Sequence, residues 1–208
     1  GFDAFSSQNI TITNSEFYTG DDCVAGFGNV NITVSDSVLN SSCSAMRFGG
    51  TNVLVRKCKM YGPGEYFFRG RMTPEEKRAC APSPRPGRNM LSAFTYYADF
   101  SMPIDEKPGN IIIKDCVFEN VDRFLHYNFS GNETWQRYRP MENITFENIN
   151  ADGVKMALNA YGRSDSLLEL TLRSVTVTMS EDSGAEELIR AAHCKRIVLD
   201  DVKIQGFK

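Results

Sequence analysis

Apolar and polar residues alternate along the chain in a nine-residue pattern that occurs seven times. In each copy the second, fourth, seventh and ninth positions are apolar or small, and the third, fifth and sixth are mostly polar. The copies occupy residues 9–17, 31–39, 52–60, 110–118 and 143–151, with weaker ones at 169–177 and 196–204. Alternation with a period of two indicates a β-strand. Its interruption after the fourth position predicts a strand, a bend and a second strand in every copy.

A second apolar segment follows most copies of the pattern. These segments are Cys23–Phe27, Ala45–Phe48, Tyr66–Arg69, Phe124–Phe129, Lys155–Ala160 and Leu188–Ala192. Short strands that recur roughly every 20 to 30 residues are typical of a solenoid, in which each coil stacks on the next. The sequence therefore predicts an all-β fold, a parallel β-helix of about seven coils, with the strands of successive coils about 4.8 Å apart.

We expect the 208 residues to form a single β-helix domain at 1–208. Gly1 lies inside a predicted coil without the polar cap that a terminal repeat needs, so we expect the central and C-terminal part of a longer protein. Residues 72–90 interrupt the repeat with proline and charge. They predict an inserted surface loop that opens with a helical turn at Thr73. Ser92–Tyr97 then predicts an extra strand.

The net charge and the positions of the cysteines argue against several classes of function for this protein. The net charge of −3 argues against a nucleic-acid-binding surface, and no run resembles a membrane span or a signal peptide. Cys58 and Cys116 share an inward position of the pattern, which favours stacked core thiols over a metal site, while a disulfide between neighbouring coils stays open. We therefore predict no metal, no cofactor, no nucleic-acid partner and no membrane contact.

Two adjacent carboxylates, Asp21 and Asp22, lie between the first two copies of the pattern. Adjacent strand residues point to opposite faces, so these two act together only on a bend, which Thr19 and Gly20 supply. Two acids close together in a groove separate their pKa values, which provides one general acid and one general base. The alternative is a solvated turn without chemistry.

The sequence Gly20-Asp21-Asp22-Cys23-Val-Ala, preceded by Gly1-Phe-Asp-Ala-Phe-Ser-Ser-Gln-Asn-Ile-Thr-Ile, resembles glycoside hydrolase family 28, the polygalacturonase-like enzymes. The resemblance covers about residues 1–60, and the rest agrees in repeat architecture. It implies a right-handed parallel β-helix, an inverting hydrolase, and a secreted or periplasmic protein. Carried over, Asp21 protonates the leaving glycosidic oxygen and Asp22 helps to position the attacking water.

The chain departs from the family pattern at several positions. A third aspartate of the family would precede Gly1, Ser41–Ser44 stands in place of the family's Gly-His-Gly, and the family's lysine is absent near Gly26. Arg69 and Arg71, which alternation puts on one side of a strand, are the candidates for the Arg-Ile-Lys that holds substrate in the family.

A substitute for the missing acid is predicted from its place in the repeat. Asp22, Ser44, Glu65 and Arg123 stand at the same offset from the preceding copy of the pattern. Glu65 is therefore expected two coils from Asp22, roughly 10 Å away. That separation lies near the upper end of the range for an inverting pair. We hypothesise that Glu65 replaces the missing carboxylate.

Residues 118–140 hold the densest mixture of aromatic and hydrogen-bonding side chains in the chain. Such a mixture suits a sugar or a carboxylate, and equally a packed loop over the solenoid. Arg47, Arg69 and His126 are expected along the same groove as Asp22. The predicted substrate-binding residues are Arg47, Arg69, Arg71, Arg123, His126, Tyr127 and Trp135.

These features predict a glycoside hydrolase-like protein that cleaves a plant-type or uronic-acid-containing polysaccharide by an inverting acid/base mechanism. Two other hypotheses stay open. One is a non-catalytic carbohydrate-binding or structural β-helix, which the missing histidine and lysine favour. The other is a polysaccharide lyase, which pairs Ca²⁺-binding carboxylates with an Arg or Lys base. The expected partner is a polysaccharide or oligosaccharide, and we expect a monomer with its first coil open to end-to-end association.

Overall fold

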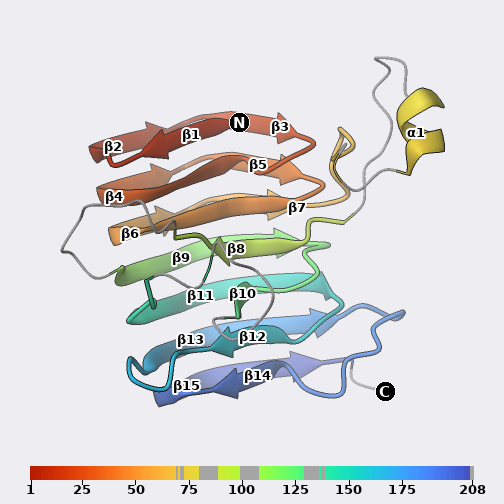
Figure 1. Cartoon of the computed structure of the whole chain (residues 1–208). Coiled ribbons are helices and arrows are strands. Elements are labelled where there is room, and N and C mark those ends of the chain that lie inside the picture. The colour runs from red at the N-terminus through yellow and green to blue at the C-terminus, as the bar shows by residue number, and fades with distance from the viewer. Residues whose placement is uncertain are drawn as a thin grey trace.

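The computed structural model describes residues 1–68, 70, 73–79, 89–98, 108–128, 136 and 139–206. Within them the chain forms fifteen β-strands and one helix, and all the strands belong to one continuous sheet with parallel pairing. The strands wind into seven coils, stacked from the first at one end to the last at the other (Figure 1). The predicted parallel β-helix is confirmed.

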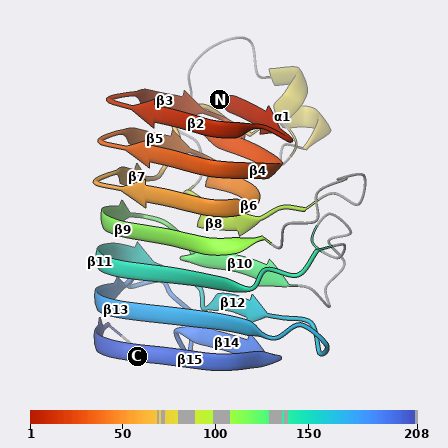
Figure 2. The ribbon, with the colours of Figure 1, turned by 90° about the vertical axis from the view of Figure 1, so that its left-hand side faces the viewer.

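Each coil contributes strands to three faces, and the long strands turn from one face to the next (Figure 2). The first face consists of β1 (Phe2–Phe5), the beginnings of β4 (Val24–Ser35) and β6 (Ser44–Arg56), and then β8 (Ser92–Tyr96), β10 (Leu125–Asn128), β12 (Leu158–Tyr161) and β14 (Ile189–Ala192). The other two faces consist of β2 (Gln8–Thr13), β3 (Glu16–Thr19), β5 (Val38–Ser41), β7 (Lys59–Tyr61), β9 (Gly109–Glu119), β11 (Asn143–Val154), β13 (Leu168–Met179), β15 (Cys194–Gln205) and the later part of β4 and β6.

A residue in the left-handed region of backbone space makes the bend in every copy of the repeat. The sixth position of all seven copies has φ between 49° and 55°. Its occupants are Asn14, Asp36, Lys57, Asp115, Asn148, Ser174 and Asp201. Asparagine and aspartate tolerate this conformation better than most residues, which explains why the sixth position is polar. The reversed curvature at this point brings the seventh position back into the core, which explains the break in the alternation.

Asparagines at the first position form a ladder along the outside of the solenoid. Asn31 donates to Asn9 at 3.1 Å, Asn52 to Asn31 at 3.0 Å, and Asn110 to Asn52 at 2.7 Å, in each case from Nδ2 to Oδ1. The backbone N–H of Asn110 donates to Oδ1 of Asn143 at 2.7 Å. Asparagine side chains at the same place in successive coils thus form hydrogen bonds with one another. This accounts for the repeated Asn that opens the pattern.

The interior is a single apolar core that runs through the stack. Phe118, Phe124 and Phe146 stack inside it, with ring centroids 5.0 and 5.6 Å apart. Cys58 and Cys116 lie one above the other at 2% exposure as free thiols, so the predicted stacked core thiols are confirmed and no disulfide joins them. None of the helices in the described ranges has the length and hydrophobicity to span a bilayer.

In the fourth coil the first-face strand is not the segment that the sequence predicted. Its first-face strand is β8, because Ser92 pairs with Ser44 of β6, whereas Tyr66–Phe68 lie outside any strand. β8 is thus the regular strand of this coil and not the extra strand that the sequence predicted at Ser92–Tyr97. The chain leaves the stack after β7, and this excursion contains α1 (Pro74–Ala79), which begins where the sequence predicts a helical turn.

Substitutions of Ser174 test whether the left-handed backbone at the sixth position disfavours branched side chains. Its φ is 51° and its side chain is exposed. A β-branched residue is sterically disfavoured there, so we expect Ser174→Val to lower the free energy of unfolding by about 1–2 kcal/mol, and Ser174→Gly not to lower it. Thr176→Val, in the extended part of the same strand, should stay within about 0.5 kcal/mol. Urea unfolding measures all three, and an unchanged midpoint for Ser174→Val contradicts the argument.

Candidate functional site

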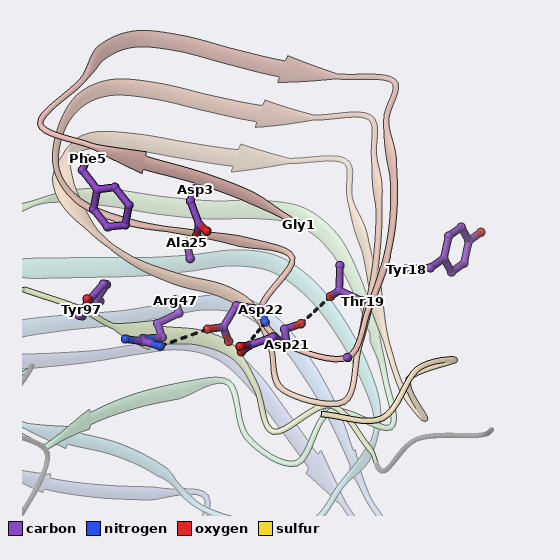
Figure 3. Close-up of a pocket in the computed structure, with 11 residues that line it drawn as sticks. Gly1, Asp3, Phe5, Tyr18, Thr19, Asp21, Asp22, Ala25, Arg47 and Tyr97 are labelled. Carbon is purple, nitrogen blue, oxygen red and sulfur yellow. Dashed lines mark hydrogen bonds and ion pairs between the residues drawn. The ribbon is translucent and has the colours of Figure 1, made fainter. Parts of the chain in front are cut away.

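A cavity of about 590 Å³ opens on the first face near the first coils (Figure 3). Its walls come from the turn that leads from β3 into β4, from β1, β4 and β6, and from the residue that follows β8. The lining residues are Gly1, Asp3, Phe5, Tyr18, Thr19, Gly20, Asp21, Asp22, Ala25, Arg47 and Tyr97. The two adjacent carboxylates and Arg47 are therefore brought together, as the sequence predicts.

Glycine is needed in the turn that carries the carboxylates. A Cβ on Gly20 would lie 2.1 Å from the carbonyl oxygen of Phe67, so any other residue would displace backbone. The hydroxyl of Ser41 donates to the carbonyl oxygen of Asp21 at 2.6 Å, and the hydroxyl of Thr19 donates to the same oxygen. The backbone of Asp21 is thus held from two coils, which leaves its side chain exposed in the cavity.

Asp22 is the buried member of the pair, with 8% of its surface exposed. Its Oδ1 accepts a hydrogen bond of 3.0 Å from the backbone N–H of Ser44, and its Oδ2 lies 3.7 Å from Nη1 of Arg47. Burial raises the pKa of Asp22, and the nearby charge of Asp21 acts in the same direction. Contacts with Cys43, Arg47 and Ser44 oppose this shift without reversing it.

Asp21 and Cys43 complete the immediate surroundings of Asp22. Oδ1 of Asp21 accepts a 2.9 Å hydrogen bond from the backbone N–H of Asp22. One oxygen of each carboxylate and Sγ of Cys43 lie within 4.8 Å of one another. Burial and Asp22 raise the pKa of the Cys43 thiol, which therefore keeps its proton at neutral pH. Among the described residues these three side chains are the cluster that offers ligand atoms for a metal ion.

Aromatic side chains line the other side of the cavity. The guanidinium carbon of Arg47 lies 4.1 Å from the ring centroid of Tyr97. Tyr97 packs edge-on against Phe27 at 4.9 Å, and Phe27 packs against Phe5 at 4.8 Å. Phe5 and Tyr97 both line the cavity, so it has an aromatic wall opposite its acidic turn. Such a wall suits the apolar face of a sugar ring.

Sequence analysis missed Asp3, Phe5 and Tyr97 as site residues. Asp3 pairs with Ala25, and Ala25 pairs with Arg47, so the three stand in one outward column of the first face. The signal was present, because counting back by one coil from Ala25 leads to Asp3. The structure thus adds a third carboxylate to the cavity.

Arg123 and His126 lie further along the same face. Thr95 pairs with Arg47 and with His126, so His126 stands two coils beyond Arg47 in the same column. Nη1 of Arg123 is 3.2 Å from Nδ1 of His126. Neither residue lines the cavity around Asp22.

Tyr127 lies in the core and does not line the cavity around Asp22. Its side chain is fully buried, packs edge-on against Tyr96 at 4.9 Å, and its hydroxyl accepts a 3.0 Å hydrogen bond from the backbone N–H of Met141. The prediction was wrong because neighbouring residues of β10 point to opposite sides, so that His126 faces outward and Tyr127 inward.

The register used for Glu65 was also wrong. Ser44 pairs with Ser92, so Ser92 occupies the place two coils from Asp22 that was predicted for Glu65. Glu65 is exposed in the turn after β7, where its backbone N–H donates to Oδ1 of Asn40 at 2.8 Å. It does not line the cavity. Three further predicted residues, Arg69, Arg71 and Trp135, lie outside the described residues.

A solved structure shares the fold. The chain is similar to a hyperthermoactive exopolygalacturonase from Thermotoga maritima, with a TM-score of 0.66 and 17% sequence identity. The similarity covers 100% of this chain and 44% of the length of that protein. The predicted right-handed parallel β-helix is thereby confirmed. No family model matches the sequence, and no curated protein matches it either.

Burial of Asp22 predicts a pH-dependent stability difference. Because its pKa is raised in the folded state, its contribution to stability is full below the ordinary pKa of aspartate and is lost as pH rises through the raised pKa. Asp22→Asn removes that loss, so the variant should melt at a higher temperature than the parent at pH 7, and the difference should shrink towards about pH 3.

Asp152→Asn, at an exposed position of β11, is the matched control and should show no such trend. Thermal unfolding monitored by circular dichroism across the pH range measures both variants. An Asp22→Asn variant that is less stable than the parent at pH 7 would mean that Arg47 and Ser44 stabilise the carboxylate more than burial disfavours it.

Proposed function

We propose that this protein is a glycoside hydrolase that cleaves a uronic-acid-containing polysaccharide at the cavity around Asp21 and Asp22. The observation that carries the proposal is the composition of that cavity, with three aspartates, an arginine and aromatic side chains on the outside of a parallel β-helix. Close carboxylates supply an acid and a base, aromatic faces pack against sugar rings, and arginine binds carboxylates. The fold shared with an exopolygalacturonase supports the same substrate class.

The environments of the aspartates support different roles. Asp22 is buried and its pKa is raised, so it is suited to hold the proton that the leaving glycosidic oxygen receives. The family resemblance assigns this role to Asp21, and the burial of Asp22 favours the reverse. Asp21 beside it raises the pKa of Asp22 further and so helps to hold the proton there.

Asp3 is the group we assign to the attacking water. Oxygens of Asp21 and Asp22 approach within 4.8 Å, which is closer than the roughly 6.5–9.5 Å that an inverting pair leaves for a water molecule. Asp3 stands on β1, a different element that lines the same cavity. A base on β1 and an acid on the turn before β4 would flank a sugar from two sides. The proposed mechanism is therefore inversion, with Asp22 as acid and Asp3 as base.

Arg47 and the aromatic wall complete the proposed substrate site. Arg47 is tied to Asp22 on one side and to the ring of Tyr97 on the other, and a third of its side chain is exposed. A uronate carboxylate beside this guanidinium would fix the sugar against Tyr97 and Phe5. Since such polysaccharides are met outside the cytoplasm, the proposal includes a secreted or periplasmic location.

The paired aspartates give the central activity test. Asp22→Asn should reduce the rate of reducing-end release from polygalacturonate by about 10²–10⁴-fold, as loss of a general acid does. Asp21→Asn should also reduce it, because Asp21 helps to hold the proton on Asp22. Asp36→Asn, an exposed turn residue on another face, should leave the rate unchanged. An aryl uronide with a good leaving group needs little protonation, so Asp22→Asn should lose far less activity on it. The assay uses the protein in its full natural length.

The same assays separate the alternatives. Activity that needs Ca²⁺ and leaves an unsaturated product identifies a lyase. Retained binding of the polysaccharide without bond cleavage identifies a carbohydrate-binding β-helix. Either result overturns the hydrolase.

The third carboxylate is tested by a pair of substitutions. We expect Asp3→Asn to reduce hydrolysis by about 10²-fold or more, because it removes the base that activates water. Glu65→Gln tests the residue predicted from sequence, and full activity in that variant excludes Glu65 from the mechanism. Proton NMR of the first product measures the anomeric configuration. Retention of configuration would contradict the assignment of Asp3 as the base for a water molecule.

A further inference from the structure

A second cavity, of about 310 Å³, lies on the first face of the solenoid and has a different charge from the first. Its lining residues are Arg123, Lys155, Met156, Ala157, Asn159, Gly184, Ala185 and Arg190. Three of these are cations and none is acidic, whereas the first cavity is lined by three aspartates and one arginine. We call the second one the distal cavity.

The two cavities lie along one line on the solenoid. Arg47, Thr95, His126, Asn159 and Arg190 pair in succession, each with the next coil. Asn159 is therefore three coils beyond Arg47, about 14 Å along the axis. The turn of Asp21 and Asp22 and the turn of Lys155 and Met156 both lead into first-face strands, β4 and β12. An extended chain that follows the axis from the first cavity meets the distal cavity.

We propose that the distal cavity binds a carboxylate of the same uronic-acid polysaccharide, several sugars away from the bond that is cleaved. This inference rests on the proposed substrate class but not on cleavage. Lysine and arginine with an adjacent amide are the side chains that bind carboxylates through charge-assisted hydrogen bonds. Asn159 supplies the amide, and its Nδ2 lies 3.2 Å from Nδ1 of His126 at the edge of the site.

Ion pairs hold two of the cations in position without using all their donors. Nζ of Lys155 contacts Asp182 at 2.6 Å, and Nε of Arg190 contacts Glu187. Neither Asp182 nor Glu187 lines the cavity. Because an ammonium group has three donors and a guanidinium five, each cation keeps donors for a ligand. The side chain of Arg190 is 55% exposed, so it reaches solvent beside the cavity.

Gly184 makes the cavity open on its remaining side. A Cβ at this position would meet no atom within 4 Å, and its backbone does not require glycine. Gly184 lines the cavity, so a large side chain there can narrow the cavity without a clash and without removing a charge or an ion pair. This allows a steric test that is independent of charge.

The experiment measures binding of hexagalacturonate by titration calorimetry in the whole protein, with Asp22→Asn present throughout to slow cleavage of the ligand. The combined Lys155→Gln and Arg190→Gln variant should bind about tenfold more weakly, and Gly184→Trp should show a similar loss. Arg173→Gln, an ion-paired arginine of β13 at 49% exposure, is the charge control. Glu181→Trp, exposed in the same connection between β13 and β14 as Gly184, is the steric control, and both controls should bind as the parent does.

Comparison with other oligosaccharides tests whether the distal cavity recognises a carboxylate. A neutral hexasaccharide should bind equally to the parent and to the charge variant. Unchanged affinity for hexagalacturonate, an equal loss for the neutral ligand, or no binding to the parent overturns the proposal. A response seen with a sulfated oligosaccharide and not with hexagalacturonate overturns the carboxylate assignment. Binding with the expected losses, in a protein whose unsubstituted form cleaves nothing, upholds the distal site and overturns the hydrolase alone.

Discussion

Parallel pairing between successive coils, held in one register, is the constraint on which the rest of this structure depends. Each residue has a fixed neighbour about 4.8 Å above and below it, so its place within its own coil decides what it touches. The left-handed residue at the sixth position returns every coil to the same path. Residues far apart in sequence, such as Asp22, Ser44 and Ser92, therefore stand in one column.

The same stacking buries the carboxyl group of Asp22, which is unfavourable for its charged form. Asp22 is buried beside Asp21, and Arg47 approaches it only to 3.7 Å while also covering the ring of Tyr97. A well-packed core would not retain such a carboxyl group, since an apolar residue of similar size is usually at least as stable. Burial raises the pKa of Asp22, which makes it easier for this carboxyl group to take up a proton. Under the proposed function, chemistry and not stability would select this residue.

The repeat made most of the fold predictable. Seven copies of a short pattern predict seven coils, and a pair of aspartates on a bend predicts the turn that reaches the cavity. Sequence reasoning failed where it assumed uninterrupted coils: the excursion after β7 moves the next first-face strand to Ser92, so the count to Glu65 lost its register. Tyr127 could have been excluded, because His126 precedes it and strand neighbours face opposite sides. The position of Asp3 followed from the same register, and only the structure showed that Phe5 and Tyr97 share its cavity.

The excursion after β7 has a broader consequence. The chain leaves the stack, forms α1, and returns to the place in the coil that an uninterrupted path would have reached. Core packing therefore constrains the residues at inward positions. The turns can change in length, and the outward positions can change in chemistry. In such a scaffold, residues that determine specificity can be substituted with little effect on the stability of the fold. The TM-score of 0.66 at 17% identity shows that the path of the coils is shared although most residues differ.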